Sequence, residues 1–158
     1  MASNGPRFGA HMSIAGEPAN ALRAGHRIGC ETIQIFTRSP NRWGGPALSD
    51  EQVDTFRQVR QETGIHPVVA HSAYLINLAS PEAGLWERSL ALAREELSRA
   101  ARLGLDGYVL HPGAHMGAGE LEGLERIATG LRALLADPAT GQVPILLETT
   151  SGSGTHLG

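Results

Sequence analysis

Short apolar runs alternate along the chain with longer segments of helical periodicity. The runs have no regular polar alternation and are flanked by Gly, Pro or a polar residue. This pattern is typical of strands buried on both faces, as in a parallel sheet. Five such runs are present: RFGAH (7–11), TIQIF (32–36), PVVAH (67–71), YVLH (108–111) and PILLE (144–148).

Helix signals fill the intervals between the runs. Pro18 is suited to the first position of a helix through ANALRAGHRIG, and Ser49 with Gln52 forms a capping box before the second helix. Ser80-Pro81 predicts the start of a third helix that ends at Gly104. In the fourth segment one apolar stripe predicts a helix that Asp137-Pro138 stops; the stripe consists of Leu121, Leu124, Ala128, Leu131 and Leu135.

The predicted order is strand–helix repeated four times and then a fifth strand. Repeated βαβ units give parallel strands, and their spacing is close to that of a (β/α)₈ barrel, which needs eight units and about 250 residues. We therefore predict an α/β fold: one domain over residues 1–158 that forms the first half of a TIM barrel, as expected for a piece of a longer protein. A complete small doubly wound domain is the alternative, because its sheet is also parallel.

Three successive runs end on a residue that can bind a metal. His71, His111 and Glu148 follow the third, fourth and fifth predicted strands. Sites in parallel α/β folds form at the carboxyl ends of strands, which lie about 4.8 Å apart. A single histidine there is more often a hydrogen-bonding residue, but three ligand types on three neighbouring strands indicate a shared cation. Two imidazoles and one carboxylate suit Zn²⁺, which lowers the pKa of a bound water enough for attack on an ester.

Two predicted loops beside these strand ends carry groups suited to nucleic acid. FTRSPNRWGG (36–45) combines Asn41, Arg42 and Trp43, which fit phosphate contact and stacking, although a plain surface loop is the commoner use of such a mixture. In SAYLINLAS (72–80), Tyr74, Leu75 and Ile76 could wedge into a base stack or pack down as a lid. The composition of this loop does not choose between the two roles.

Composition narrows the functional classes only slightly. Of 158 residues, 41% are hydrophobic and 18% charged, and the net charge of −3 gives no overall basic signal for nucleic acid. The single cysteine, Cys30, fits a reducing compartment. No apolar stretch is long enough for a signal peptide or a membrane span, so we expect a cytoplasmic protein with no membrane partner.

Several motifs, in this order, resemble bacterial endonuclease IV, the zinc-dependent apurinic/apyrimidinic endonuclease family. They are GAHMSIAGEPANAL, IQIFTRSPNRW, HSAYLINLAS, LGLDGYVLHPGAH and ETTSGSGTHLG. The resemblance implies a (β/α)₈ barrel with three zinc ions that cleaves double-stranded DNA 5′ to an abasic site and leaves a 3′-hydroxyl. It also implies that His71 and His111 are zinc ligands and that Glu148 bridges two zincs at the catalytic centre.

The same resemblance assigns DNA contacts. Tyr74 and Leu75 match the pair that penetrates the DNA, and Asn41 stands where the family has an inserted arginine, with Arg42 one residue later. It covers only about the first half of the family's length, and the other metal ligands of the family lie beyond that half. We therefore expect at most one complete zinc site and little or no nuclease activity from this chain alone, with its oligomeric state left open. A metal-dependent sugar isomerase or epimerase and a non-catalytic half-barrel that binds metal or a partner remain alternatives.

Overall fold

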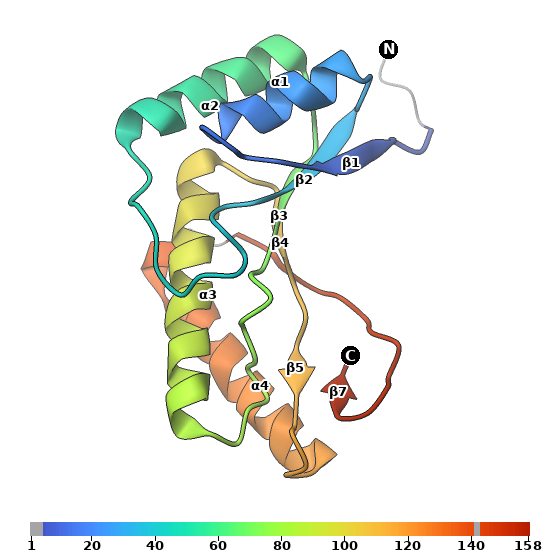
Figure 1. The fold of residues 1–158 in the computed structure, drawn as a ribbon, viewed down its shortest axis with the longest axis vertical. Coiled ribbons are helices and arrows are strands. Elements are labelled where there is room, and N and C mark those ends of the chain that lie inside the picture. The colour runs from blue at the N-terminus through green and yellow to red at the C-terminus, as the bar shows by residue number, and fades with distance from the viewer. Residues whose placement is uncertain (1–4, 141–142) are drawn as a thin grey trace.

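A computed structural model describes residues 5–140 and 143–158 of the chain. Five parallel strands form one sheet in the order β1-β2-β3-β4-β6, and β5 and β7 form a separate antiparallel pair (Figure 1). The four helices fall between consecutive strands of the main sheet, which confirms the predicted half-barrel order. The elements are β1 (Gly9–Met12), α1 (Ala19–Arg27), β2 (Thr32–Phe36), α2 (Asp50–Thr63), β3 (Val68–His71), α3 (Ala83–Leu103), β4 (Gly107–Leu110), β5 (Gly113–Ala114), α4 (Glu120–Ala136), a 3₁₀ turn (Pro138–Thr140), β6 (Ile145–Leu147) and β7 (His156–Leu157).

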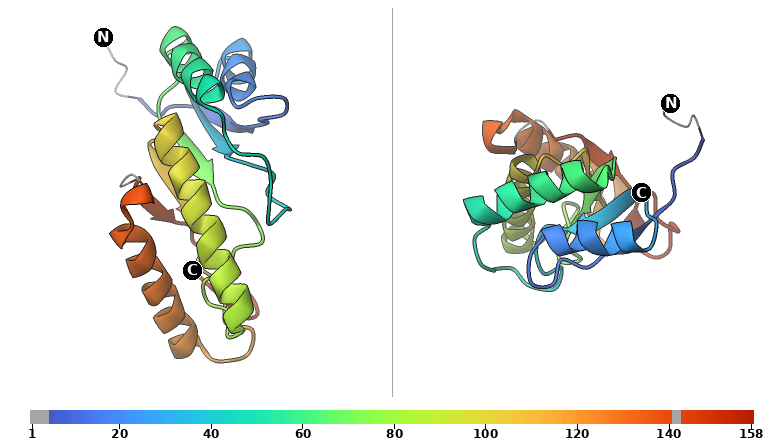
Figure 2. Two further views of the ribbon diagram at one scale, coloured as in Figure 1. Left: turned by 90° about the vertical axis from the view of Figure 1, so that its left-hand side faces the viewer. Right: turned by 90° about the horizontal axis from the view of Figure 1, so that it is seen from above.

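The helices gather on one side of the sheet and leave its other face open. α1 and α2 lie side by side near β1 and β2, whereas α3 and α4 run together along β4 (Figures 1 and 2). In β2, Ile33 and Ile35 are buried under this helical layer, and Thr32, Gln34 and Phe36 on the opposite face are only half-buried. Alternation of side chains along a strand thus separates a core face from an inner face of the half-barrel.

Local signals set most helix boundaries where the sequence predicts them. The Ser49 hydroxyl accepts the Gln52 amide (3.2 Å), and the Gln52 side chain accepts the Ser49 amide (3.1 Å). Gly104 ends α3 in the left-handed region, at φ 70°. The predicted start of α3 at Ser80-Pro81 is wrong, because the Ser80 hydroxyl accepts the Glu82 amide in a turn and the helix begins at Ala83.

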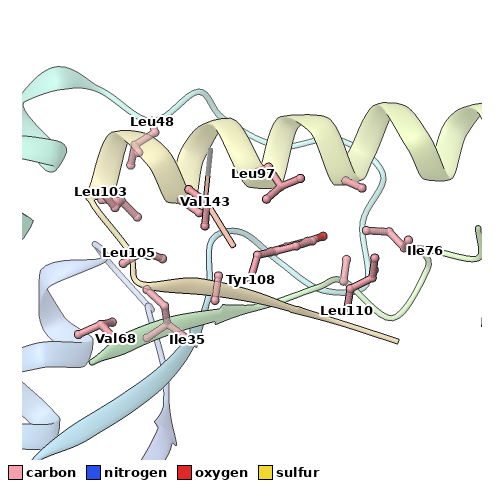
Figure 3. Packing of buried hydrophobic residues seen from close by; sticks show 14 of the residues in the cluster. Ile35, Leu48, Val68, Ile76, Leu97, Leu103, Leu105, Tyr108, Leu110 and Val143 are labelled. Atoms are coloured by element: carbon pink, nitrogen blue, oxygen red, sulfur yellow. The ribbon is translucent and has the colours of Figure 1, made fainter. Parts of the chain in front are cut away.

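The core lies between the sheet and the helices, and the Tyr108 ring extends from β4 along the underside of α3 (Figure 3). In α4 the buried positions are Gly123, Ile127, Gly130 and Leu134. Only part of the predicted apolar stripe reaches the core: Leu131 packs against it, whereas Leu121, Leu124 and Leu135 are exposed. Two glycines in the buried row explain the difference: α4 approaches its neighbours closely, and Leu78 packs over Gly130.

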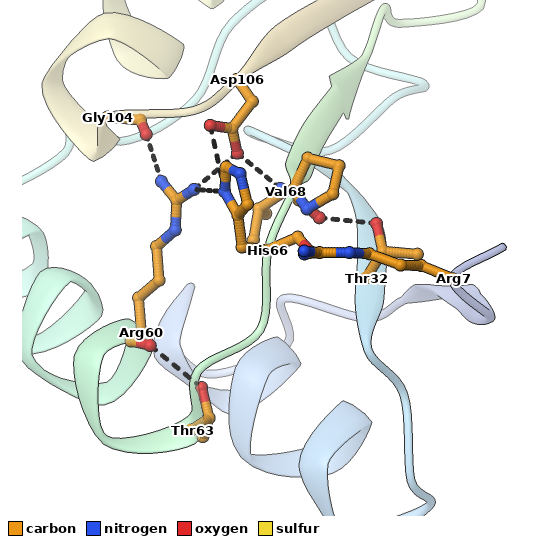
Figure 4. A network of polar contacts seen from close by, with 9 residues as sticks. Arg7, Thr32, Arg60, Thr63, His66, Val68, Gly104 and Asp106 are labelled. Atoms are coloured by element: carbon orange, nitrogen blue, oxygen red, sulfur yellow. Dashed lines mark hydrogen bonds and ion pairs between the residues drawn. The ribbon is translucent and has the colours of Figure 1, made fainter. Parts of the chain in front are cut away.

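A network of charged groups closes the sheet at the amino ends of β3 and β4. One oxygen of Asp106 accepts the Val68 backbone amide (2.6 Å) and forms an ion pair with Arg60 (2.5 Å) (Figure 4). Arg60 also donates to the Gly104 carbonyl at the end of α3, which ties α2 to α3. This network lies at the opposite end of the strands from His71.

None of the helices in the described ranges combines the length and the apolar character needed to cross a bilayer.

Candidate metal centre

Strand register and side-chain alternation place the three predicted ligands on the open inner face. His71 lies opposite Val109 in the pairing of β3 with β4, and Val109 lies opposite Leu146 in the pairing of β4 with β6. His111 and Glu148 each follow two residues after those positions, so they keep the same side of the sheet. Consecutive strand ends therefore direct all three side chains into one space.

The three side chains converge closely enough to share an ion. Glu148 Oε2 lies 3.1 Å from His71 Nε2 and 3.3 Å from His111 Nε2. One ligand atom from each residue lies within 4.8 Å of the other two, and no other group of three His, Cys, Asp or Glu side chains meets this condition in residues 5–140 and 143–158. The sequence prediction that these residues converge is confirmed.

The chemistry of the donors favours a cation between them. The Nδ1 of His71 lies 2.8 Å from the Ser72 carbonyl oxygen, which can only accept, so Nδ1 carries the proton. In the neutral ring Nε2 then presents a lone pair to the Glu148 carboxylate, and two acceptors at 3.1 Å repel unless a proton or a metal ion lies between them. Ligands about 2.0–2.1 Å from a tetrahedral zinc are ~3.3 Å apart, which matches the two distances here.

The three ligand side chains differ in their exposure to solvent. His71 is buried, whereas His111 and Glu148 keep 43% and 44% of their side-chain surface exposed, so solvent reaches the site from their side. His11 lies next to His71 on the same face, with ring centroids 6.3 Å apart, and Phe36 lies beside both. Burial, and secondarily the charge of His71, lowers the pKa of His11. His11 is thus a neighbour of the centre, outside the group of three.

The loop that leaves β3 is fixed by three consecutive backbone amides. The Ser72 amide donates to Val109 of β4 (2.8 Å), and the Tyr74 amide donates to the Pro40 carbonyl (3.2 Å). Between them, the Ala73 amide donates to Glu96 of α3 (3.1 Å). Each amide thus binds a different part of the fold, and the backbone next to His71 has little freedom.

This rigid loop presents one aromatic side chain to solvent. Tyr74 is 66% exposed, with its ring 6.3 Å from that of His71. Leu75 is half-buried against the core and Ile76 is buried, so of the three large side chains only Tyr74 projects fully. A cavity of about 390 Å³ opens beside Tyr74 and His111. The proposed DNA contacts of Tyr74 and Leu75 remain predictions.

The loop after β2 keeps its two predicted DNA-contact residues at the surface. Asn41 and Arg42 are exposed, and the Arg88 guanidinium lies 4.2 Å from the centre of the Trp43 ring. Arg42 lines a cavity of about 300 Å³ together with Arg38 and Arg99. The geometry does not choose between Asn41 and Arg42, and their contacts remain predictions.

Two residues that hold the loops next to the ligands in place are not identified from the sequence. Asn77 accepts the Ala114 amide and donates to the Ala114 carbonyl (both 2.9 Å), which joins the loop after β3 to the strand that follows His111. Glu96 is fully buried in α3 and binds the loop next to His71. The signal that could have found it is an acidic residue between Ala93, Leu97 and Ala100, inside the apolar stripe of its helix.

Comparisons with known proteins agree with this arrangement. The family described as xylose isomerase-like TIM barrel matches residues 22–158. A protein of Chloroflexus aurantiacus named "Probable endonuclease 4" is 48% identical over 153 residues, which cover 97% of this chain and 54% of that protein. The crystal structure of endonuclease IV from Thermus thermophilus superimposes with a TM-score of 0.84 at 37% identity, over 97% of this chain and 55% of that one.

A D-tagatose 3-epimerase-like protein shares the fold alone, with a TM-score of 0.71 at 17% identity over 96% of this chain and 56% of that one. The chain spans about half the length of the curated relatives it matches. From its match over most of its length, and from the parallel half-barrel with a strand-end ligand cluster, this chain belongs to the xylose isomerase-like TIM barrel family, and its resemblance to endonuclease IV is confirmed.

Proposed function

We propose that this chain supplies the metal-binding and DNA-contacting part of a DNA-repair endonuclease that hydrolyses the phosphodiester 5′ to abasic sites in double-stranded DNA. The single observation that carries the proposal is the convergence of His71, His111 and Glu148 within 4.8 Å. The similarity to proteins named endonuclease 4 supports the substrate class. One free cysteine and the absence of a membrane-crossing helix in the described ranges are compatible with a cytoplasmic setting.

Each of the three ligand residues has a different role in the proposed zinc site. His71 donates through Nδ1 to Ser72, which directs its Nε2 lone pair toward Glu148 and His111. Together with Glu148 and His111, His71 would hold a zinc ion, whose chemistry there would be to lower the pKa of a bound water so that the water could act as a nucleophile near neutral pH. Glu148 contributes one negative charge toward neutralising the cation, and its half-exposed side chain keeps the site open to solvent.

Of the proposed DNA-contacting residues, Tyr74 lies beside the ligands, with its ring 6.3 Å from that of His71. Tyr74 projects beside His71 and can fill the space left by a missing base, with Leu75 supporting it from the core side. Asn41 and Arg42 offer an amide and a cation to the phosphate backbone. Selectivity for abasic sites follows because a strand without a base has lost its stacking there, and opening it costs less.

The described residues provide one group of ligands, so we infer one zinc site and little or no incision by the 158 residues alone. Zinc binding tests the centre: His71→Ala, His111→Ala and Glu148→Ala should each abolish zinc uptake. His26→Ala, at an exposed position of α1, serves as the matched control and should bind normally. Zinc uptake unaffected by all three ligand variants would contradict the proposed centre.

DNA binding tests the substrate class. Fluorescence anisotropy with zinc present should show tighter binding of an abasic duplex than of an intact duplex, and Tyr74→Ala should remove that difference without altering zinc uptake. Efficient single-strand incision 5′ to the lesion by this chain would refute the inferred lack of activity.

A sugar isomerase or epimerase is the second candidate, since the D-tagatose 3-epimerase-like protein has the same fold. Salt separates the two, because affinity for DNA falls steeply as salt rises whereas turnover of a neutral sugar does not. Turnover of a ketose at a rate independent of salt, with no affinity for duplex DNA, would favour the second candidate.

A further inference from the structure

A carboxylate without solvent contact lies behind the candidate metal centre. Glu96 of α3 is 0% exposed, and its Oε2 accepts two hydrogen bonds, from the Ala73 backbone amide (3.1 Å) and from the Tyr108 hydroxyl (2.7 Å). Its second oxygen, Oε1, has no hydrogen-bond partner among the described residues. Burying a carboxylate costs several kcal/mol, so a group that is only partly compensated calls for a specific role.

The peptide group between Ser72 and Ala73 is bound at both of its polar ends. Its N–H donates to Glu96, and its carbonyl oxygen, that of Ser72, accepts the Nδ1–H of His71 (2.8 Å). An amide whose N–H faces a carboxylate is polarised, so its carbonyl becomes a stronger acceptor. The chain of contacts therefore runs from Glu96 through one peptide group to the imidazole that faces Glu148.

The geometry points to Glu96 as a positioning residue for the metal centre: by holding the Ser72–Ala73 peptide, it fixes the ring orientation and tautomer of His71. This inference rests on the proposed zinc site. A histidine that binds a metal normally donates its other ring N–H to a fixed acceptor, and that acceptor controls both the orientation and the basicity of the ligand. Here the acceptor is a backbone carbonyl, and Glu96 is the group that fixes it.

Tyr108 completes the arrangement and also supplies the control. Burial, and then the charge of Glu96, raises the pKa of Tyr108 well above its ordinary value of 10.0, so its hydroxyl stays a donor to Glu96. Arg38, on the loop after β2, Glu95, which pairs with Arg38, and Arg99 are charged groups that interact with Glu96. Neither Arg38 nor Glu95 touches the peptide group, so substitutions there change the local charge without releasing Ala73.

The experiment compares Glu96→Leu/Tyr108→Phe with Tyr108→Phe alone. The double variant replaces both side-chain partners with apolar groups of similar shape, a change that limits the loss of stability. Zinc affinity is measured by competition with a zinc indicator at a temperature where circular dichroism shows each protein folded. Glu96→Gln, which keeps an acceptor for Ala73, tests rescue, and Glu95→Gln is the matched control on the same helix.

We expect Tyr108→Phe and Glu95→Gln to bind zinc within about twofold of the unaltered chain. The double variant should bind about tenfold more weakly, at the lower end of the 10- to 100-fold range for residues that support metal ligands, and Glu96→Gln should recover most of that loss. Equal zinc affinity of the folded double variant and Tyr108→Phe would overturn the inference.

A second measurement reports the tautomer of His71 directly and does not depend on zinc affinity. Nitrogen-15 NMR of the histidine rings in the chelator-treated protein should show His71 protonated at Nδ1, and Glu96→Gln should preserve that signal. In the double variant the signal should shift toward a mixture of tautomers. Zinc should also shift the Ala73 amide signal of the unaltered chain, and an Ala73 signal that stays fixed while His71 responds would contradict the inference.

These outcomes separate the two proposals. No zinc uptake by the unaltered chain would refute the proposed centre, while the tautomer of His71 would still report whether Glu96 holds the peptide. Normal zinc uptake, abolished by His71→Ala but indifferent to Glu96, would refute only the role of Glu96.

Discussion

Asp106 offers a direct test of what stabilises the half-barrel. Its Oδ2 accepts the Val68 amide at the start of β3 and pairs with Arg60 of α2. Asp106→Ala removes the acceptor from a backbone N–H at a fully buried residue and leaves Arg60 without its carboxylate. Asp106→Asn keeps an oxygen for Val68 and removes only the charge.

The magnitudes of the two changes differ. An unsatisfied buried amide costs about 1–3 kcal/mol. The ion pair contributes about 0–1 kcal/mol, because the side chains of Arg60 and Asp106 keep 18% and 28% of their surface exposed. Asp106→Ala should therefore lower the free energy of unfolding by about 1–4 kcal/mol, and Asp106→Asn by about 1 kcal/mol or less. For a chain of this size each kcal/mol shifts Tm by about 2–4 °C.

Urea unfolding followed by the fluorescence of Trp43 and Trp86 provides the measurement. An unchanged m-value would show that the comparison concerns stability rather than the compactness of either state. Equal losses in the Ala and Asn variants would refute the reasoning, since they would assign the stabilisation to the charge and not to the Val68 amide. Zinc affinity should stay unchanged in both, because Asp106 lies at the opposite end of β4 from His111.

Three further predictions concern the site. Burial raises the pKa of Glu96 above its ordinary value of 4.5, so the folded state binds that proton more tightly than the unfolded state. With metal removed by a chelator, the free energy of unfolding should therefore fall as the pH rises from about 4.5 through the raised pKa of Glu96. The difference in that free energy between the unaltered chain and Glu96→Gln should fall in the same way. A difference that does not change with pH would contradict the prediction. Zinc at 100 times its Kd should stabilise the chain by about 2.7 kcal/mol, measured as a rise in Tm that EDTA reverses and that is absent in His71→Ala. Tyr74→Ala should change the free energy of unfolding by less than about 0.5 kcal/mol, as expected for a largely exposed side chain, and weaken abasic-duplex binding by about 1–3 kcal/mol in anisotropy titrations.

The strands and the ligand cluster were predictable because both follow from local patterns. Apolar runs bounded by turn residues define each strand, and repeated βαβ order fixes parallel pairing. Three ligand-type residues at successive strand ends then have to meet, provided that they share a face. The sequence alone does not determine the strand register. The pairing of β3, β4 and β6 sets a register that puts His71, His111 and Glu148 on the same face of the sheet.

The errors arise where tertiary packing decides between equivalent local patterns. In α4 three leucines of the predicted stripe stay exposed, and the row that contains Gly123 and Gly130 faces the core because these glycines allow a close approach. At Ser80 a hydroxyl that fits a helix cap serves a turn instead. Glu96 was missed because helix periodicity records which face a residue occupies and does not reveal that a polar partner lies on the neighbouring strand.

The Asp106 network has a consequence for how this protein tolerates change. It anchors the amino ends of the strands, whereas the ligands occupy the carboxyl ends. Stabilising substitutions can therefore accumulate around Arg60 and Asp106 without moving a ligand, and new substrate preferences can arise in the loops after β2 and β3 without loosening the scaffold. Substitutions at the amino ends of the strands can thus change stability, and substitutions at the carboxyl ends can change the chemistry of the site, each without affecting the other.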